Sequence, residues 1–263
     1  MSDVAVLLDP ARRTVVAHRG ASAEAPENTL PAFQRALELR VDALEMDVQM
    51  TADGVAVVIH DPTLDRTTDG TGSVATRTFA QLQAVDAGAR FTLDGRRFPF
   101  RGAGIRIPAL AEVLRLAPST PCILEVKARA AQHAVKRVLL ETGAADRCLV
   151  AAFDPRALDA LREPEFLLGA ARPDVLRLWL GAPLGIAPRL RNYKALFIPT
   201  RYGAIPVTTE PLLGIAKRLG CPVHVWTVDD VSSARRLWER GVTGIITNVP
   251  AQMLELRERM QRE

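Results

Sequence analysis

Short apolar runs alternate with amphipathic stretches along most of this 263-residue chain. The apolar run at 14–17 is followed by 29–40, in which Leu30, Phe33 and Leu37 keep the spacing of one helix face. Later strand-like runs occur at 122–126, 148–152, 166–170, 195–198, 223–228 and 244–247, and helix-like stretches at 109–116, 132–142, 211–219 and 232–240. The pattern predicts a series of β-α units.

A hairpin pattern follows the first of these units. Residues 44–50 alternate between polar and apolar, an Asp-Gly pair at 53–54 provides a turn, and 55–59 is apolar again. Because side chains on a strand repeat every second residue, Glu45 and Asp47 are expected to lie on one face.

With the hairpin counted once, the chain contains eight predicted β-α units. Strands that are apolar throughout suit a parallel sheet buried on both faces, and eight of them predict a closed (β/α)8 TIM barrel of the α/β class. An open doubly wound sheet is the alternative, but it would favour GxGxxG where 19–22 reads Arg-Gly-Ala-Ser. Residues 61–107, with a weak helix at 79–86, are expected to be a small insertion in a single domain over 1–263. The proline-rich stretch 183–188 is expected to be an irregular loop.

Composition indicates an ordinary globular chain, with 48% hydrophobic and 24% charged residues. A formal net charge of +4 without a block of like charges does not indicate a nucleic-acid partner. No apolar run approaches the ~20 residues that span a bilayer, and no signal-peptide pattern is evident. Cys122, Cys148 and Cys221 adjoin apolar runs without metal or disulfide spacing, so we expect buried thiols in a reduced, cytoplasmic protein.

Polar side chains gather where the predicted strands end. They are His18, Arg19, Glu45, Asp47, His60, Glu125 and Lys127. In a TIM barrel the carboxyl ends of the strands form one mouth, so these side chains are expected to meet there.

Together these side chains indicate phosphate chemistry. Three carboxylates without cysteine favour Mg²⁺, Ca²⁺ or Mn²⁺ over zinc. Arg19 and Lys127 suit phosphate oxygens, and His18 and His60 can exchange protons near neutral pH. Taken singly, each residue also has an ordinary structural interpretation, such as an ion pair between Lys127 and Glu125. Only their joint placement predicts a site.

An ordered set of short motifs resembles the glycerophosphodiester phosphodiesterase family over nearly the whole chain. The motifs are His18-Arg19-Gly20, Pro26-Glu27-Asn28-Thr29, Glu45-x-Asp47, Asp53-Gly54, His60-Asp61, Leu64-Asp65-Arg66-Thr67-Thr68, Gly70-Thr71-Gly72, Leu124-Glu125-Val126-Lys127, Trp226-Thr227-Val228-Asp229 and Thr247-Asn248-x-Pro250. The resemblance implies a TIM barrel with a family-specific insertion. It also implies metal-dependent hydrolysis of glycerophosphodiesters to glycerol 3-phosphate and an alcohol.

The resemblance also implies residue roles. These are an acid–base pair of His18 and His60, metal ligands Glu45, Asp47 and Glu125, phosphate contacts Arg19 and Lys127, and pocket-lining Phe153 and Trp226. The ion would be Mg²⁺, Ca²⁺ or Mn²⁺. Attack by the substrate's own 2-hydroxyl, through a cyclic phosphate, and direct attack by water both stay open.

The chain departs from the family pattern near the expected pocket. Ala152 precedes Phe153 where the family usually has Ser, Asp229 stands where Asn is common, and Asn248 stands where Asp is common. None of these departures removes a proposed catalytic or metal-binding residue.

Two alternative functions stay open at this level. A lysophospholipase D-type activity on lysophospholipids or sphingolipids would favour an exposed apolar rim near the site, for which 182–186 and 91–100 are candidates. A catalytically silent phosphodiester-binding protein would bind such ligands without turnover. Neither the leaving alcohol nor the oligomeric state follows from the sequence.

Overall fold

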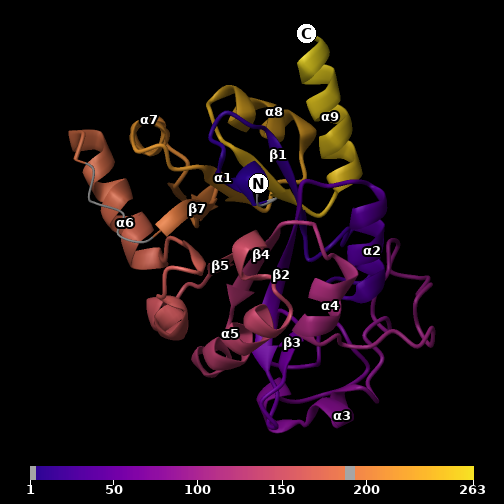
Figure 1. Ribbon diagram of the computed structural model, residues 1–263. Helices are drawn as coiled ribbons and strands as arrows, with labels where there is room; N and C mark the ends of the chain where they lie inside the picture. Colours follow the sequence, from indigo (N-terminus) through magenta and orange to yellow (C-terminus); the bar gives the residue numbers. More distant parts are fainter. Residues whose placement is uncertain (1–3, 187–192) are drawn as a thin grey trace.

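A closed barrel of parallel strands forms the centre of the computed structural model, which describes residues 4–186 and 193–263 (Figure 1). In these residues the barrel strands are β1 (Thr14–His18), β2 (Ala43–Met50), β4 (Cys122–Val126), β5 (Cys148–Ala151), β6 (Leu167–Gly169), β7 (Tyr193–Pro199), β10 (Val223–Trp226) and β11 (Gly244–Thr247). Their order is β1-β11-β10-β7-β6-β5-β4-β2, and pairing of β1 with β2 closes the ring. The TIM barrel is confirmed, and the open sheet is excluded.

Helices lie around the outside of these strands (Figure 1). They are α2 (Leu30–Glu38), α4 (Leu110–Leu116), α5 (Gln132–Glu141), α6 (Arg172–Gly181), α7 (Glu210–Arg218), α8 (Val231–Glu239) and α9 (Pro250–Arg262). Most predicted helices agree with these bounds to within one or two residues. Between β5 and β6 the chain instead forms the 3-10 segment Pro155–Leu161.

The amino end of the barrel is closed by the short helix α1 (Ala5–Leu8). Leu7 packs against small and aliphatic side chains that point inward from the strands, namely Val16, Ala43, Ile123, Leu149, Ala195 and Ile246. The carbonyl of Leu7 accepts a 2.9 Å hydrogen bond from Nε2 of His224, whose ring stacks on Phe197 with 5.2 Å between centroids. His224 is therefore a structural residue of the barrel interior.

This buried imidazole makes stability depend on pH. Burial lowers the pKa of His224 to about 4, so the folded protein resists a proton that the unfolded chain accepts near 6.5. Stability is thus fully present above pH 6.5 and is lost as the pH falls toward 4. We expect the unfolding free energy to drop by about 3 kcal/mol over that window.

Urea denaturation across the window measures this effect. The His224→Gln variant keeps a donor for the Leu7 carbonyl but does not titrate, so its unfolding free energy should depend less steeply on pH. Only the slopes are compared, so a lower overall stability of the variant does not affect the test. Equal slopes in the two proteins would show that His224 does not cause the loss of stability at low pH.

The predicted insertion follows the hairpin of β2 and β3 (Ala56–Val58). Its side chains form a small core of their own beside β3, made of Val57, Ile59, Leu64, Val74, Leu82, Ala87, Ile105 and Ile107. The weak helix predicted at 79–86 is shorter, α3 (Phe79–Leu82). The chain leaves it toward Asp86, whose N–H donates to Asp69 Oδ1 at 2.7 Å.

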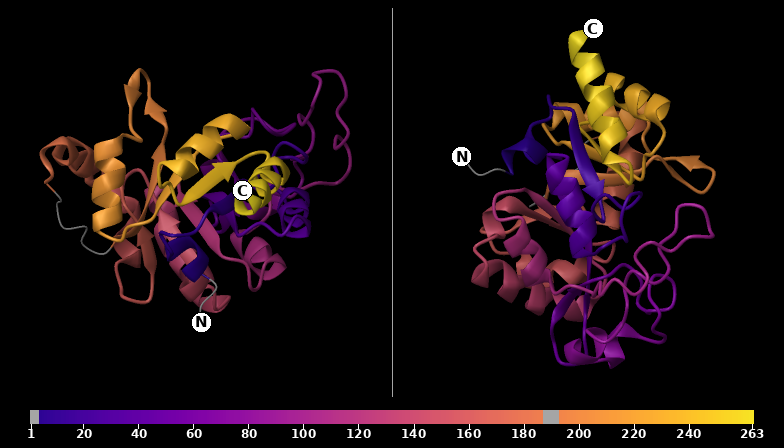
Figure 2. Two further views of the ribbon diagram at one scale, coloured as in Figure 1. Left: turned by 90° about the horizontal axis from the view of Figure 1, so that it is seen from above. Right: turned by 90° about the vertical axis from the view of Figure 1, so that its right-hand side faces the viewer.

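A second hairpin, β8 (Arg201–Tyr202) with β9 (Ile205–Pro206), was not predicted from the sequence. In Figure 2 it projects from the same side of the barrel as the insertion loop near residues 90–100.

Two further sequence predictions concern the cysteines and the loop at 183–188. Cys122, Cys148 and Cys221 are buried free thiols, as expected. The loop begins with a 3-10 turn, Ala182–Leu184, and its end at 187–188 lies outside the described residues. Among the described helices, none is long and apolar enough to cross a membrane.

Candidate active site

The backbone turns sharply where β1 ends. Arg19 and Gly20 both adopt positive φ, +58° and +83°. The backbone N–H of Arg19 donates to the main-chain oxygen and to Oε2 of Glu45, each at 3.0 Å. The His-Arg-Gly motif therefore holds His18 and Arg19 against the carboxyl end of β2.

Gly20 is required at this turn for two reasons, and its replacement is a direct test. Its φ disfavours any side chain, and a Cβ there would lie 2.6–2.8 Å from atoms of Ala32. We expect Gly20→Ala to lower the unfolding free energy by about 2–3 kcal/mol in urea denaturation.

Gly54→Ala is the matched control, because Gly54 has a similar φ of +79° but nothing within 4 Å of the added Cβ. Its unfolding free energy should fall only by the smaller cost of backbone strain, about 1 kcal/mol. Equal losses in the two variants would show that the close approach to Ala32 does not matter.

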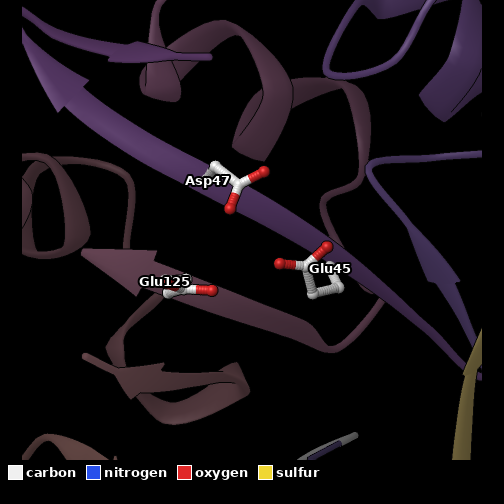
Figure 3. A group of neighbouring side chains, drawn as sticks. All are labelled: Glu45, Asp47 and Glu125. Carbon is white, nitrogen blue, oxygen red and sulfur yellow. The ribbon is translucent and has the colours of Figure 1, made fainter. Parts of the chain in front are cut away.

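Three carboxylates gather on two neighbouring strands. Glu45 and Asp47 lie on β2, and Glu125 lies on β4 in register with Asp47. One oxygen from each lies within 4.8 Å of the others, and Figure 3 shows the three side chains directed toward a common space. Glu45 and Asp47 are buried, with 5% and 1% exposure.

The charges of this cluster are not balanced within the protein. Burial, followed by the charges of Asp47 and Glu125, raises the pKa of Glu45 well above its ordinary value. Burial also raises the pKa of Glu125, against the effect of Lys127. For Asp47, burial is outweighed by Lys127 and Arg19, which lower its pKa. Hard oxygen donors with excess negative charge fit a divalent cation such as Mg²⁺, Ca²⁺ or Mn²⁺.

Two cationic side chains border the carboxylates. Lys127 Nζ lies 3.0 Å from Asp47 Oδ1 and 2.6 Å from Glu125 Oε1. Arg19 Nη1 donates to Glu27 Oε1 at 2.8 Å. Its Nε lies 3.0 Å from Asp47 Oδ2 but is not aligned with it, and has no hydrogen-bond acceptor among the described residues. Both side chains are thus placed to contact an anion beside the acidic cluster.

His18 is oriented by a hydrogen-bonded pair of residues that follow the last two barrel strands. Its Nδ1 lies 2.8 Å from Asn248 Oδ1, and Asn248 Nδ2 donates to Asp229 Oδ2 at 2.7 Å. This arrangement assigns the proton to Nδ1 and leaves Nε2 free, 3.9 Å from Glu45 Oε2. Burial, together with the charge of Arg19, lowers the pKa of His18, so the ring is neutral at pH 7.

His60 is oriented by the carboxylate next to it in sequence. Its Nδ1 lies 2.5 Å from Asp61 Oδ1, and Asp61 Oδ2 accepts from Arg66 Nε at 2.6 Å. Although burial raises the pKa of Asp61, hydrogen bonds from Arg66 and His60 outweigh it and hold the pKa at about 2. The ionised carboxylate accepts a hydrogen bond from Nδ1–H of His60, so Nε2 is available to the site.

A cavity of about 500 Å³ connects these groups. Phe153 and Trp226 line it, with their rings edge to face at 5.9 Å between centroids. The other predicted site residues that line it are His18, Arg19, Glu45, His60, Glu125 and Lys127. Asp47 lies behind this wall, so the structure brings all the predicted residues to one mouth.

Several site residues have no predicted role in the sequence analysis. Asn28 Nδ2 donates to Asp47 Oδ2 at 2.9 Å, and Glu27 is held by Arg19 and by a bidentate pair with Arg66. Both belong to the Pro-Glu-Asn-Thr motif, which indicated that the segment mattered but not what it does. Neither segment considered as an apolar rim, 182–186 or 91–100, lines the cavity.

Fold and site together define an α/β barrel with three carboxylates that could hold a cation, and two histidines, at the carboxyl ends of its strands. Residues 18–252 match the model of the glycerophosphoryl diester phosphodiesterase family. The chain belongs to this family.

Individual relatives agree with this assignment. A glycerophosphodiester phosphodiesterase of Caldanaerobacter subterraneus is 33% identical over 251 residues, covering 92% of this chain and 96% of the relative. An Oleispira antarctica phosphodiesterase, solved in complex with the product sn-glycerol-3-phosphate, is 25% identical with a TM-score of 0.78, covering 98% and 100%. A glycerophosphodiester phosphodiesterase from Agrobacterium tumefaciens is 26% identical with a TM-score of 0.74, covering 92% and 99%.

Proposed function

We propose that this chain hydrolyses glycerophosphodiesters to glycerol 3-phosphate and an alcohol, using a divalent cation held by Glu45, Asp47 and Glu125. The observation that carries the proposal is the acidic cluster in one cavity with two oriented histidines. Membership of the family supports it, as does the glycerol-3-phosphate bound by the Oleispira antarctica relative.

The phosphate would be bound by positive charge from two sources, the divalent cation and the side chains of Arg19 and Lys127. When bound, a divalent ion offsets the negative charge on the phosphate oxygens. Arg19 lines the cavity with its guanidinium, and Lys127 lines it with a compact ammonium. Glu27 holds the Arg19 guanidinium in place through Nη1. These contacts would hold the phosphate in the cavity that both histidines line.

The two histidines divide the proton transfers. His18 is neutral and free at Nε2, so it is the base that takes the proton of the attacking hydroxyl. His60 is then the acid: with Nδ1–H held by Asp61, it enters the step with a second proton on Nε2 and gives that proton to the leaving oxygen. The attacking hydroxyl belongs either to the substrate's glycerol or to water, and both fit this division.

Metal removal tests the proposal. Purified protein treated with EDTA should release no glycerol 3-phosphate from glycerophosphocholine or glycerophosphoethanolamine, because the acidic cluster then lacks its cation. Adding Mg²⁺, Ca²⁺ or Mn²⁺ in turn to dialysed protein should restore release with at least one of them. Full activity in EDTA, or none with any ion and either substrate, would contradict the proposal.

A further inference from the structure

Arg66 lies outside the cavity but joins two carboxylates that orient groups inside it. It belongs to the Leu64-Asp65-Arg66-Thr67-Thr68 segment of the insertion, and it is not among the residues that line the cavity. Its Nη1 and Nη2 donate to the two oxygens of Glu27 at 2.8 and 2.7 Å, and its Nε donates to Asp61 Oδ2 at 2.6 Å. All three nitrogens of one guanidinium therefore bind carboxylates.

Each of these carboxylates also contacts one group that lines the cavity. Glu27 Oε1 accepts from Arg19 Nη1 at 2.8 Å, and Asp61 Oδ1 lies 2.5 Å from His60 Nδ1. Arg19 is a proposed phosphate contact, and His60 is the proposed acid. Although Arg19 follows β1 and His60 follows β3, both are therefore supported by the guanidinium of Arg66.

The insertion fixes the backbone on both sides of Arg66. Leu64 is buried in the core of the insertion, and its N–H donates to the carbonyl of Gly72 at 3.0 Å. The hydroxyl of the fully buried Thr68 donates to the Leu64 carbonyl at 2.7 Å, and the Thr68 carbonyl accepts from Arg90 Nε at 2.7 Å. The turn that carries Arg66 is therefore closed by buried contacts.

The planar shape of a guanidinium is what allows one side chain to bind both carboxylates. Its N–H groups lie in one plane, so two of its nitrogens can donate in parallel to Glu27 while Nε faces Asp61. An ammonium is a compact point charge and lacks this fork. Arg66 is 48% exposed, but its partners Glu27 and Asp61 are only 22% and 24% exposed, so these pairs are better shielded than ordinary surface ion pairs.

We infer that Arg66 is a positioning residue for two parts of the reaction: through Asp61 it orients His60 for proton transfer, and through Glu27 it holds Arg19 for phosphate binding. The inference rests on the proposed function and gives the insertion a part in it. Without Arg66, the Asp61 carboxylate can turn away from His60, and Glu27 is held from one side only. Misplacing a reacting group by about 1 Å can cost about 10²-fold in rate.

Arg66→Gln tests the inference in the metal-loaded protein. Steady-state kinetics with glycerophosphocholine should show kcat lowered by about 10–100-fold, because His60 loses its fixed orientation. Calorimetric titration with glycerol 3-phosphate should show about tenfold weaker binding, because Arg19 is held less firmly. A residue that only fastens the insertion to the barrel would change the unfolding temperature without changing both kcat and this affinity.

Arg101→Gln is the matched control within the insertion. Arg101 Nε donates to the carbonyl of Ala89 at 2.9 Å, and its guanidinium lies 3.8 Å from the centroid of the Phe98 ring. Among the described residues it forms no ion pair, and it does not line the cavity. Its removal should leave kcat and the affinity for glycerol 3-phosphate unchanged.

Arg66→Lys is a second variant, which keeps the positive charge and disturbs the fold least. Because lysine lacks the planar fork, this variant should show most of the loss in kcat that Arg66→Gln shows, with an unfolding temperature close to that of the wild type. The variant therefore separates the geometry of the guanidinium from its charge.

A second background shows whether Arg66 acts through its two carboxylates. The double variant Glu27→Ala/Asp61→Ala removes both acceptors and leaves Arg66 in place. Adding Arg66→Gln to it should lower kcat and the affinity for glycerol 3-phosphate by less than about twofold, because the same contacts are already lost.

The outcomes are distinct. An Arg66→Gln variant that keeps either the wild-type kcat or the wild-type affinity for glycerol 3-phosphate would overturn the inference. Wild-type kcat in Arg66→Lys, or a full further loss in the Glu27→Ala/Asp61→Ala background, would overturn it equally. Wild-type protein that turns over no glycerophosphodiester would overturn the proposed function. In that case the calorimetric titration still decides the inference, and equal affinities of the wild type and Arg66→Gln would overturn it.

Discussion

His18→Ala and His60→Ala are each expected to lower kcat/KM for glycerophosphocholine by about 10²–10⁴-fold, the usual contribution of a general base or acid. Each imidazole is held at Nδ1 by one acceptor, Asn248 for His18 and Asp61 for His60, so that Nε2 is free to move a proton. The loss should fall mainly on kcat, because phosphate binding is assigned to other side chains. Steady-state kinetics of both variants, with the metal ion in excess, measure it.

His133→Ala is the control for this prediction. His133 is exposed on α5 and does not line the cavity, so its removal should leave kcat/KM unchanged. The double variant His18→Ala/His60→Ala should lose less than the product of the single losses if the two groups act in one concerted transfer. Near-full activity in either single variant would remove that histidine from the mechanism.

Glu45→Gln is expected to abolish activity and at the same time stabilise the metal-free protein. The carboxylate is a proposed cation ligand, and its loss should cost at least about 10²-fold in metal affinity or activity. Its pKa is raised by burial and by the neighbouring carboxylates, so its charge opposes folding when no cation is present. Calorimetric titration with Mg²⁺ and thermal unfolding in EDTA measure the two effects.

A Glu→Gln change outside the site provides the comparison. Glu141 is exposed at the end of α5, and Glu141→Gln should alter neither metal affinity nor the unfolding temperature in EDTA. Glu45→Gln should unfold at a higher temperature than the wild type in EDTA and bind Mg²⁺ more weakly. Unchanged metal affinity in Glu45→Gln would show that the cation lies elsewhere.

The barrel was predictable because its strands are buried on both sides and are therefore apolar along their whole length. Run 148–152, for example, reads as a strand without any help from its surroundings. Helix α1 and the β8–β9 hairpin were not predicted, because four and two residues are too few to show a period. Helix α6 was missed for another reason, because its apolar residues do not share one face: Leu176 and Trp179 line the cavity, whereas Leu178 is buried in the core.

The residues of the site also differ in how far their roles could be predicted from the sequence. The proposed catalytic and metal-binding residues stand at strand ends in short motifs, where residue type alone indicates phosphate chemistry. Asn248 also stands at a strand end in a short motif, but its part in orienting His18 could not be predicted, because the two residues lie 230 positions apart along the chain. Asn248 and Asp229 appeared from the sequence as two separate departures from the family pattern. In the structure they hydrogen bond to each other, so one amide–carboxylate pair has exchanged its members.

The identity of the products tests the central claim most directly. Phosphorus NMR of glycerophosphocholine incubated with the metal-loaded protein should show the substrate resonance replaced by that of glycerol 3-phosphate, with choline released in equal amount. The same sample with His18→Ala should show no change over the same time. Appearance of phosphocholine and glycerol would place the cleavage on the other side of the phosphorus. An unchanged spectrum with every glycerophosphodiester and metal ion tried would contradict the account.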